Sequence, residues 1–143
     1  RVIKEVKQIG FRVRTSFIFD LPTTTKEDMQ KTINFILETE PDEIRGHFLA
    51  LRLGTTIYNK LAKEKEIPTQ YIHSDKPLIE NEKYTNSEML QDIETLISKL
   101  KDKGYKIVKN VKEWENLESL RNKEGKIKFL SFCPSKYGID WEK

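Results

Sequence analysis

A strand that runs directly into a capped helix marks residues 12–39. The stretch "RVRTSFIF" at 12–19 is rich in β-branched and aromatic residues, and its closing apolar run predicts a strand buried on both faces. Pro22 restricts the backbone before it, so the strand should end there. Threonines with an acid three residues later then fit a helix start in two registers, Thr24 with Glu27 or Thr25 with Asp28. A strand of this kind, followed by a helix, indicates a parallel sheet.

The same alternation continues on both sides of this segment. Apolar residues at helical spacing predict a helix over residues 2–9 and a second over 26–39. The stretch "PDEIRGHFLALRL" at 41–53 predicts another strand, with its apolar centre at 48–51, and a short helix through Leu61 follows. Helix, strand, helix, strand and helix in succession indicate repeating βα units.

The pattern changes beyond about Glu66. Residues 67–86 contain two prolines and no clear period, which predicts an irregular crossing or a weak hairpin. Thr85 and Glu88 fit a capping box, and the long helix that they open should end at Gly104. The pattern allows a short strand in "YKIVKNV" at 105–111 and predicts a helix over 112–122. The stretch "KIKFLSF" at 126–132 fits either a final strand or an extended arm.

Composition narrows the classes of function. The 143 residues are 36% hydrophobic and 34% charged, which predicts a small core under a charged surface. No apolar run approaches the ~18 residues of a membrane span, and the first residues lack a signal-peptide core, so a cytoplasmic protein is expected. The 26 Lys and Arg are interspersed with 23 Asp and Glu, which offers no support for a nucleic-acid partner. Cys133 is the only cysteine, so this chain alone has neither a disulfide framework nor a cysteine cluster for a metal.

Two motifs in the first half together resemble a known family. Residues 17–29 read "FIFDLPTTTKEDM", a helix and Pro-Asp at 41–42 follow, and "LGTTIY" stands at 53–58. This order resembles the C-terminal βα units of radical SAM enzymes, most of all the cobalamin-associated branch that includes the anaerobic magnesium-protoporphyrin ester cyclase type. The resemblance implies an α/β fold with C-terminal βα units of a partial (β/α) TIM-like barrel at 1–66. A mostly helical α+β extension would then occupy 67–143.

The resemblance also implies cofactors. Such enzymes use S-adenosylmethionine (SAM) and a [4Fe-4S] cluster, and cobalamin is a third cofactor to consider in this branch. SAM lies at the carboxyl ends of the strands, which implies cofactor contacts at Ile18, Asp20, Leu49 and Ala50. The cluster needs the three thiolates of a C-x-x-x-C-x-x-C loop, which Cys133 cannot supply alone. The expected partner is therefore a missing N-terminal part of the same enzyme.

Several polar residues allow two interpretations. Asp20 stands where the family has glycine, and it either caps the loop or faces the site. Arg45 and Arg52 either bind a substrate carboxylate, such as a porphyrin propionate, or form surface ion pairs. His47 is a candidate substrate contact, and it fits a core or pocket histidine better than a metal ligand, because no second ligand has suitable spacing. The threonines at 23–25 fit helix capping better than ligand contact, although Thr23 and Thr24 depart from the Gly-Glu of the family motif.

Two hypotheses of function follow. In the first, the chain is the C-terminal part of a radical SAM oxidoreductase or methyltransferase-type enzyme, where it contributes a wall for the SAM adenine and a surface for a small-molecule substrate. In the second, it is a non-catalytic substrate-docking or protein-interaction module that has kept the βα scaffold. A severed barrel would expose strand edges, so the chain is expected either to self-associate through them or to repack its extension over them.

Overall fold

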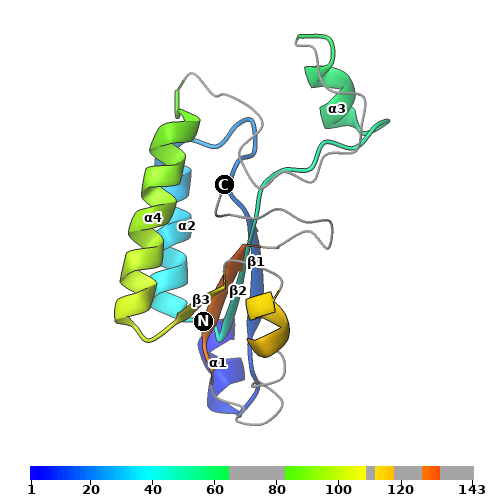
Figure 1. The fold of residues 1–143 in the computed structure, drawn as a ribbon. Helices are drawn as coiled ribbons and strands as arrows, with labels where there is room; N and C mark the ends of the chain where they lie inside the picture. Colours follow the sequence, from blue (N-terminus) through cyan, green and yellow to red (C-terminus); the bar gives the residue numbers. More distant parts are fainter. Residues whose placement is uncertain (65–82, 109–111, 118–126, 133–143) are drawn as a thin grey trace.

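The computed structural model describes residues 1–64, 83–108, 112–117 and 127–132, and it shows an α/β fold (Figure 1). In sequence, a helical turn at 112–117 comes between the strands at 106–108 and 129–132. No helix within these ranges has both the length and the apolar character to cross a membrane. In chain order the elements are α1 (Val2–Gln8), β1 (Arg14–Ile18), α2 (Lys26–Thr39), β2 (Glu43–His47), α3 (Thr56–Leu61), α4 (Asn86–Asp102), β3 (Lys106–Val108) and β4 (Phe129–Phe132).

The strands form one sheet of four parallel strands in the order β1-β2-β4-β3. The last of the described strands, β4, therefore lies inside the sheet, and β1 and β3 are the outer strands in the described part of the chain. Helices α2 and α4 lie side by side on one face, and the helical turn at 112–117 lies on the other (Figure 1). The predicted α/β fold with a parallel sheet is confirmed.

The main core fills the space between the sheet and the two long helices. Alternate strand residues point to this face, where several side chains have no exposed surface: Ile36, Ile44, Leu96, Leu100 and Leu130. Gly46 is the tightest position, because a Cβ there would lie 2.5 Å from Cε1 of Phe132 and 2.9 Å from Cε2 of Phe19. A glycine at this position leaves room for the two aromatic rings, whose centroids are 5.9 Å apart.

Capping boxes begin both long helices, as the sequence predicts. Of the two registers at α2, the structure uses the second: the Thr25 hydroxyl accepts from the Asp28 N–H at 3.2 Å, and the Asp28 carboxylate accepts the Thr25 N–H at 3.1 Å. The bonds with the Thr25 side chain and backbone hold the pKa of Asp28 below its ordinary value. Thr85 and Glu88 make the same box at α4. These local bonds fix where each helix starts along the chain.

Two local expectations were wrong. The strand β1 is not buried on both faces: Ile18 is 50% exposed, because β1 is an outer strand whose second face is not covered along its length by the described helices. The second strand lies before the apolar run at 48–51, because residues 43–47 pair with β1 and residues 43–46 pair with β4. The helix predicted over residues 2–9 is present as α1, and none of its residues is buried.

The second half of the chain contributes to the same sheet as the first. Helix α4 covers the sheet beside α2, while β3 and β4 extend it beyond β2. The predicted boundary near residue 66, the irregular segment before Lys83, the end of the helix expected over 112–122, and Cys133 lie outside the described residues.

Candidate functional site

The carboxyl ends of β1 and β2 lie together at one edge of the sheet. Ile18 is in register with His47, and the N–H of Phe19 donates to the carbonyl of His47 at 3.1 Å. Just beyond the strands, Asp20 is 2% exposed, and one of its carboxylate oxygens accepts the N–H of Leu49. This bond does not cap the loop that follows Asp20, which was one of the two interpretations; it joins the two strand ends instead.

The residues predicted to contact the cofactor follow these two strand ends but differ in exposure. The side chain of Leu49 is buried with Leu51 and Tyr58, next to α3. Ile18 is half-exposed and lies on the opposite face of β1 from Phe17, which packs against Phe35 of α2. Ala50 is partly exposed. The accessible apolar surface at this edge therefore comes from Ile18 and Ala50, while Asp20 and Leu49 hold the edge together.

The threonine loop caps α2 and also borders a hollow. The capping role belongs to Thr25, as described above. Thr23 and Thr24 line a cavity of about 210 Å³ between the end of β1 and the first turn of α2, together with Ile18 and Leu21. The structure thus supports capping for one threonine and brings two others beside the exposed end of β1.

The sheet face opposite α2 and α4 carries polar side chains. Since side chains alternate along a strand, the residues on this face are those that do not contact the two long helices. The strand register aligns them in two adjacent rungs, Arg14 with Glu43 and Phe129, and Ser16 with Arg45 and Ser131. His47 is one rung nearer the carboxyl edge, so the structure places two predicted substrate residues, Arg45 and His47, on the same face.

The first rung is a compact ion-pair cluster. Glu43 is 1% exposed, and its carboxylate accepts the Nε–H of Arg14 at 2.6 Å. A second guanidinium nitrogen, Nη2 of Arg12, lies 3.6 Å from the other oxygen of Glu43 and donates to the carbonyl of Ile127 at 2.7 Å. The buried carboxylate therefore has a positive charge at each oxygen, which offsets the cost of its burial.

The second rung is built differently. The guanidinium carbon of Arg45 lies 4.6 Å from the ring centroid of Trp114, a cation–π contact. The Nε of Arg45 and the Oγ of Ser131 are both buried, and neither has a hydrogen-bond partner in the described part of the chain. Ser131 itself is 1% exposed. Sequence reasoning missed Ser131 and Trp114 as site residues, because only the strand register brings them beside Arg45.

Arg52 is separated from the other predicted substrate residues. It is exposed in the turn before α3, where its carbonyl accepts the Thr55 N–H at 3.2 Å and the Thr55 hydroxyl at 2.8 Å. Helix α3 stands away from the sheet (Figure 1). Arg52 therefore belongs to a different part of the surface from Arg45 and His47.

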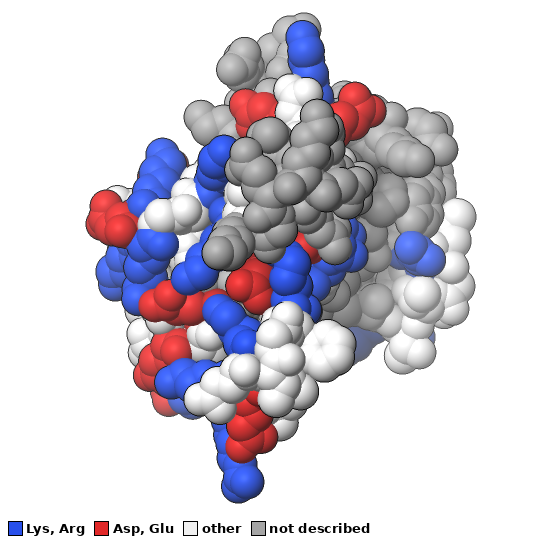
Figure 2. Space-filling view, turned by 90° about the horizontal axis from the view of Figure 1, so that it is seen from below, with Lys and Arg blue, Asp and Glu red and all other residues white. Residues whose placement is uncertain are grey.

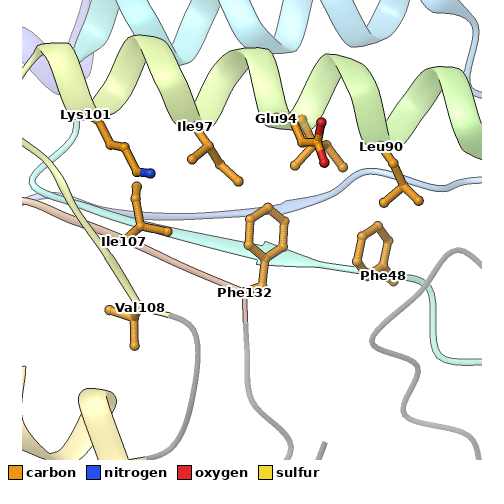
Figure 3. A pocket seen from close by; sticks show the side chains of 9 residues that line it. Phe48, Leu90, Glu94, Ile97, Lys101, Ile107, Val108 and Phe132 are labelled. Carbon is orange, nitrogen blue, oxygen red and sulfur yellow. The ribbon is translucent and has the colours of Figure 1, made fainter. Parts of the chain in front are cut away.

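A cavity of about 290 Å³ lies between α4 and the carboxyl ends of β3 and β4 (Figure 3). Its lining is mainly apolar and includes Phe48 and Phe132, while Glu94 and Lys101 extend from α4 toward the sheet. Sequence reasoning missed these two charged residues. Their spacing with Leu90 and Ile97 places all four on one side of α4, which is the signal that could have indicated them.

The amino edge of the sheet is built for stability. Glu40, in a left-handed conformation at the end of α2, accepts hydrogen bonds from Lys103 at 2.5 Å and Lys128 at 3.0 Å, which lower its pKa to about 2. The Tyr105 hydroxyl donates to the carbonyl of Pro41, and burial raises the pKa of that hydroxyl above its ordinary value. Figure 2 shows acidic and basic side chains interspersed on this side, as the sequence predicts.

The described residues contain no group of three His, Cys, Asp or Glu side chains that could hold a metal ion. The structure defines the fold class: an α/β fold in which the strands of a parallel sheet alternate with helices along the chain. Comparisons of the chain with protein families, curated proteins and solved structures found no match.

Proposed function

We propose that this chain is the C-terminal part of a radical SAM oxidoreductase or methyltransferase-type enzyme. The observation that carries the proposal is the placement of the two family-like motifs. They follow adjacent parallel strands, β1 and β2, whose ends meet at one edge and are linked by the Asp20–Leu49 bond. That edge is where βα folds bind their ligands. In this proposal β1 and β2 are strands of a partial barrel, with α2 outside it and the polar face inside.

The residues at this edge fit a role beside an adenine ring. The side chains of Ile18 and Ala50 offer apolar surface, and Asp20 positions the backbone of Leu49 rather than the cofactor itself. When SAM is bound next to a reduced cluster, it supplies the oxidising power for hydrogen abstraction from the substrate. The chain's own contribution is to orient the adenine and to keep a small-molecule substrate on the polar face, near His47 and Arg45.

The [4Fe-4S] cluster does not fit this chain. Three thiolates are needed, and the sequence has one cysteine. The proposal therefore requires another segment of the complete enzyme to provide the cluster loop, and we assign no step to residues of this chain through the cluster. Cobalamin dependence stays a prediction, to which no described residue is assigned.

The test uses the polypeptide encoded by the complete reading frame. We expect its sequence to contain a C-x-x-x-C-x-x-C loop. After cluster reconstitution and reduction with dithionite, we expect the protein to form 5′-deoxyadenosine from SAM. Ile18→Glu should raise the KM for SAM about tenfold, because a carboxylate in the adenine wall costs on the order of 1.4 kcal/mol. Val2→Glu is the matched control, since Val2 is an exposed apolar residue on α1. A folded full-length protein with no cluster loop and no SAM cleavage would refute the proposal.

A non-catalytic docking module is the second candidate, and one observation favours it. The family has glycine where this chain has Asp20, and here the Asp20 carboxylate occupies the N–H of Leu49 at the edge. A module of this kind would bind a substrate or protein without cleaving SAM. Self-association belongs to the same proposal, because β1 is an outer strand and Val2, Ile9 and Phe11 are exposed. Sedimentation of the chain at several concentrations tests it.

A further inference from the structure

The polar face of the sheet carries more positive than negative charge in its described part. Arg12 and Arg14 share the buried carboxylate of Glu43. No ion pair joins Arg45 to any acidic side chain in the same described ranges. A guanidinium with a buried Nε and no acceptor is costly, and an anion supplied by a ligand would offset that cost.

The geometry of Arg45 suits a planar anion. Its guanidinium lies over the ring of Trp114, and Trp114 is itself held edge-on against Phe129, with ring centroids 5.6 Å apart and an interplanar angle of 80°. The contact with the ring holds the guanidinium beside Trp114, and the N–H donors of a guanidinium form a planar fork. A carboxylate is the group that such a fork binds with two parallel hydrogen bonds.

A second donor stands beside it. Ser131 is paired with Arg45 across β2 and β4, so both side chains are on the same face. Its hydroxyl is buried without a hydrogen-bond partner in the described residues. We propose that Arg45 and Ser131 form an oxyanion site that binds a carboxylate group of the substrate. The proposal deepens the proposed function and rests on it in placing the substrate on this face.

The position of the site also limits the substrate's shape. His47 is two residues beyond Arg45 on the same strand face, a rise of about 6–7 Å toward the edge where the cofactor is proposed. A substrate anchored through its carboxylate at Arg45 would extend past His47 to that edge. The substrate class is therefore a carboxylic acid whose reacting carbon lies at least that far from its carboxylate.

The experiment observes Arg45 directly, by NMR of the arginine side-chain Nε–H groups in the 143-residue chain. Benzoate is the probe, and benzamide is its uncharged counterpart of the same shape. We expect benzoate to shift the Arg45 Nε–H signal in a saturable manner, and benzamide to leave it unchanged. The absence of a benzoate-dependent shift in the folded chain, or equal shifts with both compounds, would overturn the site, and neither measurement needs a variant.

Two variants separate binding from packing. Arg45→Lys keeps the charge but loses the fork, and it should raise the Kd for benzoate about tenfold. Arg1→Lys is the matched control, because Arg1 is exposed on the surface and pairs only with Glu5 among the described residues. Unchanged benzoate affinity in folded Arg45→Lys would mean that the guanidinium fork does not bind benzoate, and that the contact of Arg45 with Trp114 is structural only. SAM cleavage by the full-length enzyme is measured independently, so benzoate binding without cleavage would refute the proposed function and leave the anion site standing.

Discussion

Two neighbouring rungs on the same face of the sheet, that of Glu43 and that of Arg45, differ in how their buried charged groups are paired. In the first, Glu43 is buried between Arg12 and Arg14, so each oxygen of the carboxylate lies near a positive charge. In the second, Arg45 is held by an aromatic ring, and its buried Nε has no hydrogen-bond partner in the described residues. The first rung is complete in the chain alone. The second has donors available for a ligand, which is the difference expected between a structural cluster and a binding site.

The largest effect should come from breaking the complete rung. Glu43→Ala removes the only carboxylate that the described structure places between Arg12 and Arg14, and should lower the free energy of unfolding by about 3 kcal/mol. Arg45→Met should change it by less than about 1 kcal/mol, because that side chain loses only its contact with Trp114. Urea denaturation of both variants measures the contrast. Equal losses would show that the two rungs are equally structural.

A somewhat smaller loss is expected on the other face of the same strand. Gly46→Ala would place a methyl group 2.5 Å from the ring of Phe132, so overpacking should cost about 1–3 kcal/mol. The second variant, Gly46→Ala with Phe132→Leu, should recover part of that loss, because the smaller side chain makes room. Thermal unfolding monitored by circular dichroism checks both. If the double variant loses as much stability as the two single variants lose in sum, the clash with Phe132 is not the cause of the destabilisation by Gly46→Ala.

The smallest effect concerns pH at the amino edge. Hydrogen bonds from Lys103 and Lys128 lower the pKa of Glu40 from 4.5 to about 2, so the unfolded chain binds the proton more readily between these values. The stabilisation is therefore complete above the ordinary pKa and is lost as the pH falls toward about 2. Since the Glu40 side chain is 34% exposed, this stabilisation should amount to about 1 kcal/mol. Glu40→Gln should remove this part of the acid dependence in urea titrations at several pH values, and Lys103→Met should reduce it. A wild-type slope in both variants would rule out Glu40 as the source.

The elements that the sequence predicted well are those set by local chemistry. Capping by Thr25 and Thr85 needs only the acid three residues later. Helix α4 begins where that pairing predicts, and α2 begins at the second of its two predicted registers. The parallel sheet followed from the alternation of strands and helices. The errors arose where burial depends on a distant neighbour: β1 is half-exposed because it is an outer strand, which its own residues do not indicate.

The candidate site was predictable only in part. Arg45 and His47 share a strand, so their common face follows from alternation, and Asp20 was recognisable as a polar residue after a strand. The bond from Leu49 to Asp20, the stacking of Trp114 and the position of Ser131 depend on the pairing of β2 with β1 and β4. Strand order is a property of the whole sheet, and no short stretch of this sequence encodes it.

The strand order also has a consequence for how the chain is made. Strand β4 is synthesised after all the other described strands, yet it lies between β2 and β3. On the ribosome, the unit β1–α2–β2 and the unit α4–β3 emerge first, with no direct strand pairing between them among the described elements. The sheet becomes continuous only when residues 129–132 insert between the two units. Closing a gap with the final strand involves contacts that are distant in sequence, so we expect this insertion to be the slow step of folding.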